Sequence, residues 1–258
     1  MYEVDGKRAI ITAASSGIGY AVASVLAESG ASVLMSSHDS QKIKQAANNL
    51  KKNGLKAYPV VFDLSESDAG SLISKASDRM GGSDILIMNY GDPKLSPFME
   101  ITGEEWDMYY RMFIRATTSL VREFVPQTNG WGRIVFITSM TTRESYPGFS
   151  ISGSLRAAVV NLGKTLSLEL GKLGITVNSI SQGYFLTERL QAVITRNSAL
   201  NGTSTEEERR KLVEDIPSGR IGRPEEIGYL VRFLCSEEAS YINGANIPID
   251  GGLTRYPY

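Results

Sequence analysis

Short, continuous apolar runs that recur along the whole chain constrain its fold most strongly. They occupy residues 9–11, 33–35, 60–62, 85–88, 134–137, 175–180 and 247–249. A strand with one face in water alternates apolar with polar residues, whereas an uninterrupted apolar run is typical of a strand covered on both faces. The runs therefore predict the strands of a buried parallel sheet.

Segments with the apolar period of a helix separate these runs. Two clear examples are the sets Ile18, Ala21, Val22, Val25, Leu26 and Leu155, Val159, Leu162, Leu166, Leu170. Strand and helix alternate about six times, which predicts a doubly wound α/β fold with helices on both faces of the sheet. In such a fold, ligands bind beyond the carboxyl ends of the strands.

One domain is expected for the 258 residues, 42% of which are hydrophobic and suffice for a sizeable core. The least patterned segment, residues 186–222, is expected to be a mobile excursion that covers a substrate. Its apolar residues fit either a substrate pocket or a helix packed on the core; they are Phe185, Leu186, Leu190 and Val193.

Charge and rare residues exclude several classes of function. A formal net charge of -1 argues against a nucleic-acid partner. The chain starts without the pattern of a secretory signal, and it lacks an apolar run of roughly 18 residues that would suit a membrane span. The single Cys235 fits a reducing compartment, so we expect a soluble, cytoplasmic protein. The single His38 argues against a histidine-rich metal site, and no metal is expected.

A glycine- and serine-rich turn follows the first predicted strand and precedes the first predicted helix. The start of a helix offers free N–H groups and a positive dipole end, both of which suit a pyrophosphate. A plain strand-to-helix turn is the structural alternative. The residues predicted to bind a dinucleotide here are Thr12, Ser15, Ser16, Gly17, Ile18 and Gly19.

Further motifs make the chain similar to one known family. The turn resembles the pattern T-G-x3-G-x-G with Ala13 at its first glycine, and residues 88–91 stand where that family has N-N-A-G. Asp63-Leu64 and the segments 174–178, 222–227 and 250–252 also match. Over residues 5–253 the chain therefore resembles the short-chain dehydrogenase/reductases, most of all their 3-oxoacyl-acyl-carrier-protein reductase-like branch.

This resemblance implies a three-layer Rossmann fold with a sheet of about seven strands, usually in a homotetramer or homodimer. It also implies a nicotinamide cofactor and a small carbonyl or alcohol substrate. Members of the family work with an Asn, Ser, Tyr and Lys tetrad. In the tetrad, Tyr exchanges the substrate proton, Lys holds the ribose and lowers the Tyr pKa, Ser orients the carbonyl and Asn carries a relay water.

The chain departs from that tetrad at three of its four positions. The Ser position is Ser139, but Ser152 stands at the Tyr position, Arg156 at the Lys position and Phe113 at the Asn position. Ser139, Ser152 and Arg156 are the catalytic candidates. Arg156 keeps the positive charge with a different geometry, while Ser152 does not titrate near neutral pH as a tuned phenol does. Divergent branches of the family share this kind of departure.

Two function hypotheses follow from this mixture. The first is an NAD(P)-dependent oxidoreductase with slow or specialised chemistry, in which Tyr146 or Tyr184 is either a substitute phenol or a packing residue. The alternative is a non-catalytic nucleotide-binding homologue that acts as a sensor or subunit partner. A serine hydrolase is excluded, because the only His falls on the adenosine side of the site.

The residues after the second strand bear on the choice of cofactor. Ser37 would not repel a 2′-phosphate and His38 could donate to one, so NADP is favoured. Asp39 keeps NAD open, since a rotated loop would turn its carboxylate toward the ribose. The other cofactor-binding residues implied by the resemblance are Asp63, Leu64, Asn89, Tyr90, Gly91, Arg156, Gly183 and Thr187.

Overall fold

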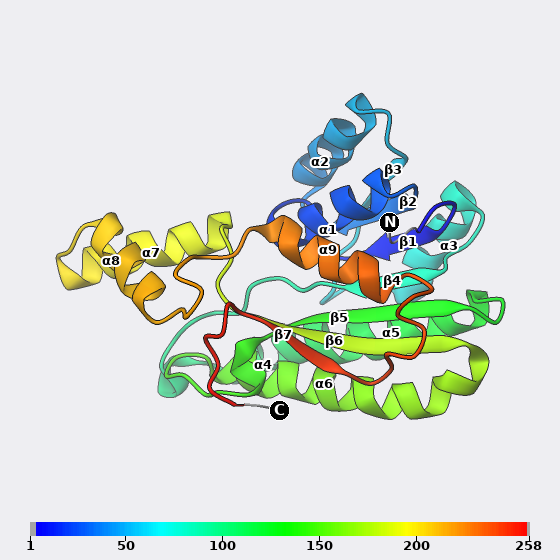
Figure 1. Cartoon of the computed structure of the whole chain (residues 1–258). Coiled ribbons are helices and arrows are strands. Elements are labelled where there is room, and N and C mark those ends of the chain that lie inside the picture. Colours follow the sequence, from blue (N-terminus) through cyan, green and yellow to red (C-terminus); the bar gives the residue numbers. More distant parts are fainter. Residues whose placement is uncertain (1–3, 257–258) are drawn as a thin grey trace.

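The computed structural model describes residues 4–256, so Met1–Glu3, used above to argue against a secretory signal, lie outside the described residues. Seven parallel strands form one sheet in the order β3-β2-β1-β4-β5-β6-β7 (Figure 1). Their bounds are β1 Arg8–Ile11, β2 Ser32–Ser37, β3 Ala57–Val61, β4 Ile85–Met88, β5 Gly132–Ser139, β6 Ile175–Gln182 and β7 Asn246–Ile249. Each predicted run coincides with one of these strands, apart from Phe62, which lies just beyond β3.

Helices cover both faces of the sheet, which confirms the predicted doubly wound α/β fold. The helices are α1 Gly17–Glu28, α2 Ser40–Lys52, α3 Ala69–Met80, α4 Gly103–Tyr110, α5 Ala116–Phe124, α6 Ser150–Leu170, α7 Glu188–Asn201, α8 Thr205–Glu214 and α9 Pro224–Leu234. One core is formed with α1, α2 and α9, and a second with α3, α5 and α6 on the opposite face.

The side chains of a single strand show why the apolar runs are continuous. On β5, Val135 and Ile137 enter the first core, while Ile134 and Phe136 enter the second. All four are at most 1% exposed. Because both faces of this strand lie under helices, polar residues have no solvent-facing position, and the alternation of a half-exposed strand is lost.

A π-helical turn, η2 (Arg111–Arg115), joins α4 to α5 in one continuous run of helix. Its central residue, Phe113, is 0% exposed, and the Thr117 hydroxyl donates to the Phe113 carbonyl at 2.6 Å. Wide turns of this kind are rare in helices and are frequently found at functional sites. Here the turn places Phe113 in the core beneath β4 and beside α6.

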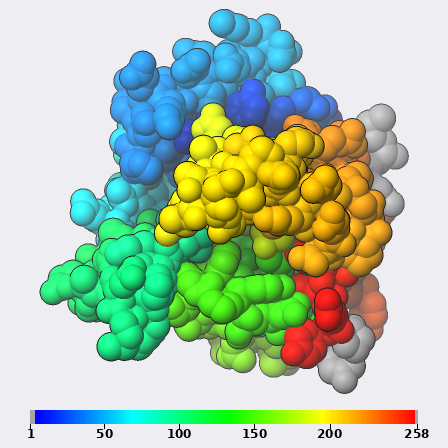
Figure 2. All heavy atoms as spheres, turned by 90° about the vertical axis from the view of Figure 1, so that its left-hand side faces the viewer, coloured from blue at the N-terminus to red at the C-terminus, as the bar shows by residue number. Residues whose placement is uncertain are grey.

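Segment 186–222 is more ordered than its sequence pattern predicts, because it contains α7 and α8. Leu190, Ile194, Ile216 and Ile221 form a small core of their own. The two helices project beyond the sheet on the side where β6 ends (Figure 1). Figure 2 faces this side and shows the pair, in yellow, between the blue N-terminal part and the green middle of the chain.

Two searches of the described residues were negative. None of the helices within residues 4–256 is long and apolar enough to cross a membrane. The same range contains no group of three or more His, Cys, Asp or Glu side chains arranged to hold a metal ion.

Candidate active site

The residues predicted for the site gather at the edge of the sheet where the strands end. Parallel strands bring their carboxyl ends to the same edge. Neighbouring strands there end at or just before Ser37, Asp63, Thr12, Asn89, Ser139 and Gly183. Candidate residues from both halves of the chain therefore lie along the same edge of the sheet, where ligands bind in this class of fold.

The glycine-rich turn has the close packing that its pattern predicts. A Cβ atom on Gly19 would collide with the Ala13 carbonyl oxygen and lie 2.8 Å from Asn89 Nδ2. Gly17 has a φ of 54°, which glycine adopts without strain. Ala13 has a φ of 46°, so the position where relatives have glycine keeps a left-handed backbone even though alanine occupies it.

Hydrogen bonds fasten this turn to the end of β4. The Thr12 hydroxyl donates to the Asn89 carbonyl at 2.6 Å and accepts from the Asn89 N–H at 3.0 Å. Asn89 Nδ2 in turn donates to the Ala13 carbonyl at 3.0 Å. The Asn89 side chain therefore supports the turn directly.

The residues present fit the pyrophosphate of a dinucleotide. The N-terminal residue of α1 is preceded by Ser16, whose exposed side chain makes no capping hydrogen bond, and the first turn holds no acidic residue. The free N–H groups and the dipole of this twelve-residue helix are thus available to an anion. Thr187, at the start of α7, lies over Gly17, with its Cγ2 3.4 Å from a Cβ placed on that glycine.

At the adenosine end, serines hold the loop that follows β2. Ser15 Oγ donates to Ser37 Oγ at 3.1 Å, and the Asp39 N–H donates to the same oxygen at 3.2 Å. His38 is exposed. One carboxylate oxygen of Asp63 already accepts two hydrogen bonds, from the Ser65 N–H at 2.7 Å and from the Ser65 hydroxyl at 2.6 Å.

Asp39 faces helix α2 rather than the ribose position. One of its oxygens accepts from the N–H groups of Gln41 and Lys42, both at 2.9 Å, and caps that helix. The Lys42 N–H, followed by the Gln41 N–H, lowers the Asp39 pKa. A rotation toward the ribose, as the NAD alternative requires, would break both bonds.

Helix α6 places the two most divergent positions side by side. Ser152 and Arg156 are one turn apart, and Arg156 Nη1 donates to Ser152 Oγ at 2.7 Å. Ser152 Oγ also lies 3.2 Å from the hydroxyl oxygen of Thr141. The backbone N–H of Thr141 donates to Ser139 Oγ at 3.2 Å. Thr141 thus connects all three catalytic candidates, although no motif in the sequence singles it out.

An aromatic stack buries the Arg156 guanidinium. Its Cζ atom lies 4.8 Å from the Phe113 ring centre, and the Tyr90 ring lies 4.7 Å from the same ring. The Tyr90 hydroxyl lies 2.7 Å from that of Thr117, and burial raises the Tyr90 pKa. Only the backbone of Tyr90 therefore faces the cofactor side. Burial lowers the pKa of Arg156 to about 10.

Neither of the two candidate substitute phenols hydrogen-bonds to Ser152 among the described residues. Tyr146 lines a pocket of about 270 Å³ together with Phe149 and Gly153, on another flank of α6. Burial, reinforced by Glu144, raises the pKa of Tyr146 to about 12, which weakens it as an acid. Tyr184 packs against the small core of α7 and α8, and burial raises its pKa as well. Neither phenol is tuned as the family's Tyr is.

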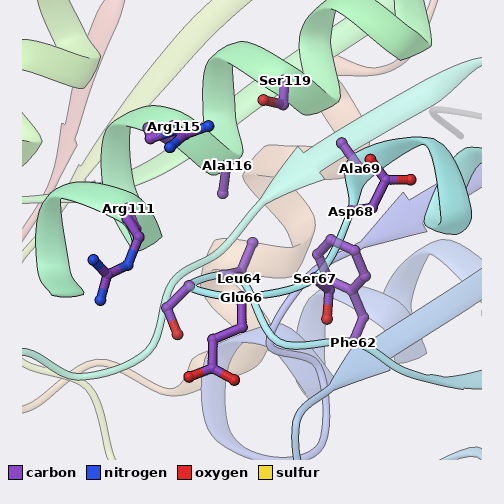
Figure 3. A pocket seen from close by; sticks show the side chains of 11 residues that line it. Phe62, Leu64, Glu66, Ser67, Asp68, Ala69, Arg111, Arg115, Ala116 and Ser119 are labelled. Atoms are coloured by element: carbon purple, nitrogen blue, oxygen red, sulfur yellow. The ribbon is translucent and has the colours of Figure 1, made fainter.

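A second pocket, of about 310 Å³, lies beside Leu64 between the loop after β3 and the π-helical turn. Figure 3 shows Arg111 and Arg115 on its helical side and Glu66 and Asp68 on the loop side. It adjoins the adenosine end of the site and is separate from Ser152 and Arg156.

Comparison with known proteins covers nearly the whole chain. The family described as Enoyl-(Acyl carrier protein) reductase matches residues 12–254. Gluconate 5-dehydrogenase of Gluconobacter oxydans is 32% identical over 98% of this chain and 97% of its own. The 3-oxoacyl-[acyl-carrier-protein] reductase of Rickettsia prowazekii is also 32% identical, over 98% of this chain and 99% of its own.

The fold is also similar to that of solved structures over nearly the whole chain. L-sorbose reductase from Gluconobacter frateurii, complexed with NADPH and L-sorbose, superimposes with a TM-score of 0.93. The two sequences are 29% identical, and the match covers 99% of each chain.

Proposed function

Because the chain belongs to the short-chain dehydrogenase/reductase family, we propose that it is an NADP(H)-dependent oxidoreductase acting on a small carbonyl or alcohol substrate. The observation that carries the proposal is the uncapped start of α1 behind a tight turn that keeps Gly17 and Gly19, at the edge where Ser139 also ends its strand. Anion binding at that helix start and an orienting hydroxyl beside it are the two parts that such a reaction requires.

The environment of Ser37 and His38 supports NADP over NAD. Ser37 carries no charge to repel a 2′-phosphate, and the exposed His38 is free to donate to one. Asp39, the acidic residue that an NAD ribose would need, instead accepts a hydrogen bond from the Gln41 N–H at the start of α2. The sorbose reductase relative was solved with NADPH, which agrees with this choice.

The chain's own residues divide the remaining work. When bound, the nicotinamide exchanges a hydride with the substrate. Ser139 orients the carbonyl, Ser152 offers the hydroxyl at the position of the missing phenol, and Arg156 supplies positive charge next to it. Loss of a tuned general acid typically costs about 10²–10⁴-fold in rate, so we expect a slow or specialised enzyme.

A second candidate function is a non-catalytic nucleotide-binding protein. One observation favours it. Arg156 donates to Ser152 and stacks on Phe113, so Arg156 and Ser152 already bind each other instead of facing a substrate. In that case the cofactor would bind without turnover.

Assembly and location are also part of the proposal. We expect a homotetramer or homodimer that forms through residues 106–125 and α9, with Tyr110 and Tyr229 exposed there at 48% and 47%. Cys235 is buried and free, which suits a reducing cytoplasm.

A fluorescence titration with NADPH and NADH tests the cofactor part of the proposal. A screen of 3-oxoacyl thioesters, ketoses and simple ketones then tests turnover. Tighter NADPH binding with measurable reduction of any substrate supports the enzyme, and binding without turnover across the panel supports the second candidate. Much tighter NADH binding would contradict the choice of NADP.

A further inference from the structure

Arg156 is a buried cation that forms no ion pair with another described residue. It is 6% exposed, and none of the ion pairs among the described residues includes it. Its one hydrogen bond goes to the neutral Ser152 hydroxyl. A buried charge is costly unless it is paired, so this guanidinium calls for a further acceptor when the site is filled.

One edge of the guanidinium remains unused. Nη1 is bound to Ser152, and the face lies over Phe113. Nε is buried without a hydrogen-bond partner, whereas Nη2 has no partner among the described residues and is not fully buried. The N–H bonds of Nε and Nη2 point in parallel, which is the fork that binds both oxygens of a carboxylate.

A second arginine strengthens the positive potential at this place. Arg189 lies in the first turn of α7, donates to the Pro93 carbonyl at 3.1 Å and lies 3.8 Å from Asp92. Burial lowers the Arg156 pKa most, Asp92 and Tyr90 act to raise it, and Arg189 acts to lower it. Both arginines therefore interact with the single carboxylate of Asp92, and their two positive charges exceed its one negative charge.

We propose that the Nε–Nη2 edge of Arg156, supported by Arg189, binds a carboxylate of the substrate, so that the substrate class is an oxo acid or, in reverse, a hydroxy acid. This inference rests on the proposed function. In the reduction, NADPH gives a hydride to the carbonyl carbon and the oxygen takes a proton from the solvent, which yields the hydroxy acid and NADP⁺. A carboxylate neutralised by arginine draws electrons from a neighbouring carbonyl, which lessens the need for the missing phenol.

Binding of a substrate analogue provides the first test. Oxamate carries a carboxylate beside a carbonyl, and ethyl oxamate is its neutral counterpart. Calorimetry on the protein, with and without NADPH, is expected to show oxamate binding at least about tenfold more tightly, as two charge-assisted hydrogen bonds imply. Equal affinities for the two compounds would overturn the proposal.

Variants locate the carboxylate site. Arg156→Met is expected to weaken oxamate binding about tenfold and Arg189→Met about threefold, with little effect on ethyl oxamate. Arg115→Met is the matched control, because Arg115 lines the other pocket (Figure 3), and it should leave both affinities unchanged. An oxamate preference that survives the Arg156 and Arg189 substitutions would overturn the proposal. If Arg156→Met does not fold, the half-exposed Arg189→Met decides alone.

Turnover provides a second readout. We expect kcat/KM for 2-oxobutanoate to exceed that for its methyl ester, and the difference to vanish in Arg156→Met. Reduction of both compounds at equal rates would reject the oxo acid class and leave the proposed reductase intact. Failure of NADPH to bind would instead reject the proposed function, and the oxamate titration without NADPH still tests the carboxylate site.

Discussion

At the scale of single residues, Gly19 is a position where the structure leaves no room for a side chain. Gly19→Ala would force the Ala13 carbonyl and the Asn89 side chain apart, and so displace the turn that receives the pyrophosphate. We expect at least a tenfold loss of NADPH affinity, measured by fluorescence titration. Gly103→Ala at the start of α4 is the control, because its Cβ would meet nothing within 4 Å. Unchanged binding in Gly19→Ala would contradict the assignment of this turn.

The divergent tetrad positions give a second prediction at this scale. Ser152→Tyr with Arg156→Lys restores the family's proton-exchanging pair, and we expect turnover to rise by about 10²-fold or more. Ser154→Tyr with Arg156→Lys is the control, since Ser154 lies in the pocket on the other flank of α6. The measurement is NADPH oxidation with a ketone of the panel that lacks a carboxylate, because Arg156→Lys also alters the proposed carboxylate site. An unchanged rate would show that the loss of Tyr and Lys does not limit the chemistry.

The proposed cofactor half of the site is easier to predict from the sequence than the proposed catalytic half. The turn from Thr12 to Gly19 would act through its backbone geometry, which small residues at fixed spacing reveal. The stack of Tyr90, Phe113 and Arg156 joins residues from three distant segments, and no spacing rule links them. Thr141 and Arg189 escaped notice for the same reason, since their roles depend on neighbours in space.

At the scale of elements, the strands were predictable and the α7–α8 pair was not. The strands β1, β4 and β5 are continuous apolar runs because both of their faces are buried. Helix α8 consists largely of charged residues, so its sequence lacks the apolar face on which helix prediction depends. Its start was nevertheless signalled, because Ser204 and Glu207 form a reciprocal cap at the N-terminus.

Glu208 ties α7 to α8 and makes the pair sensitive to acid. Its carboxylate accepts from Lys211 Nζ at 2.7 Å, Thr203 Oγ1 at 2.7 Å and Asn201 Nδ2 at 3.2 Å. The bond from Lys211, followed by the other two, lowers the Glu208 pKa to about 2. The pKa of a Glu side chain in an unfolded chain is about 4.3. The stabilisation that the ionised Glu208 contributes is therefore complete above that pH, and it is lost as the pH falls toward 2.

We therefore expect the α7–α8 pair to open in acid before the sheet does. Amide hydrogen exchange, corrected for its intrinsic rate, should show protection of residues 188–214 falling between pH 4.5 and 2.5. Glu208→Gln should show low protection already at pH 6, whereas the exposed Glu206→Gln should behave like the parent protein. Protection of the segment that does not change with pH would contradict this role of Glu208.

At the scale of the whole molecule, an ion pair between Arg8 and Asp84 fastens two strands at the edge of the sheet opposite the site. Arg8 Nε donates to Asp84 Oδ2 at 2.8 Å and Arg8 Nη2 to Oδ1 at 2.6 Å, so the start of β1 is fastened to the residue before β4. Burial acts to raise the Asp84 pKa, but the hydrogen bonds from the Arg8 side chain and backbone outweigh it and lower the pKa.

Replacement of this carboxylate should weaken the global fold. We expect Asp84→Asn to lower the free energy of unfolding in urea by about 1–2 kcal/mol at pH 7, a value reduced by the partial exposure of the pair. Because the folded pKa lies below the unfolded value of about 3.9, the difference from the parent should shrink below that pH. The exposed Asp78→Asn is the control. A full difference at pH 2.5 would contradict an ionic origin.

The separation of these two edges bears on how such a chain evolves. Residues near the carboxyl ends of the strands can be exchanged without affecting the pair of Arg8 and Asp84 at the other end. The fold can therefore be kept while the residues of the proposed reaction centre change. A lineage of this kind keeps an inherited scaffold on which a new activity, or none, can become established.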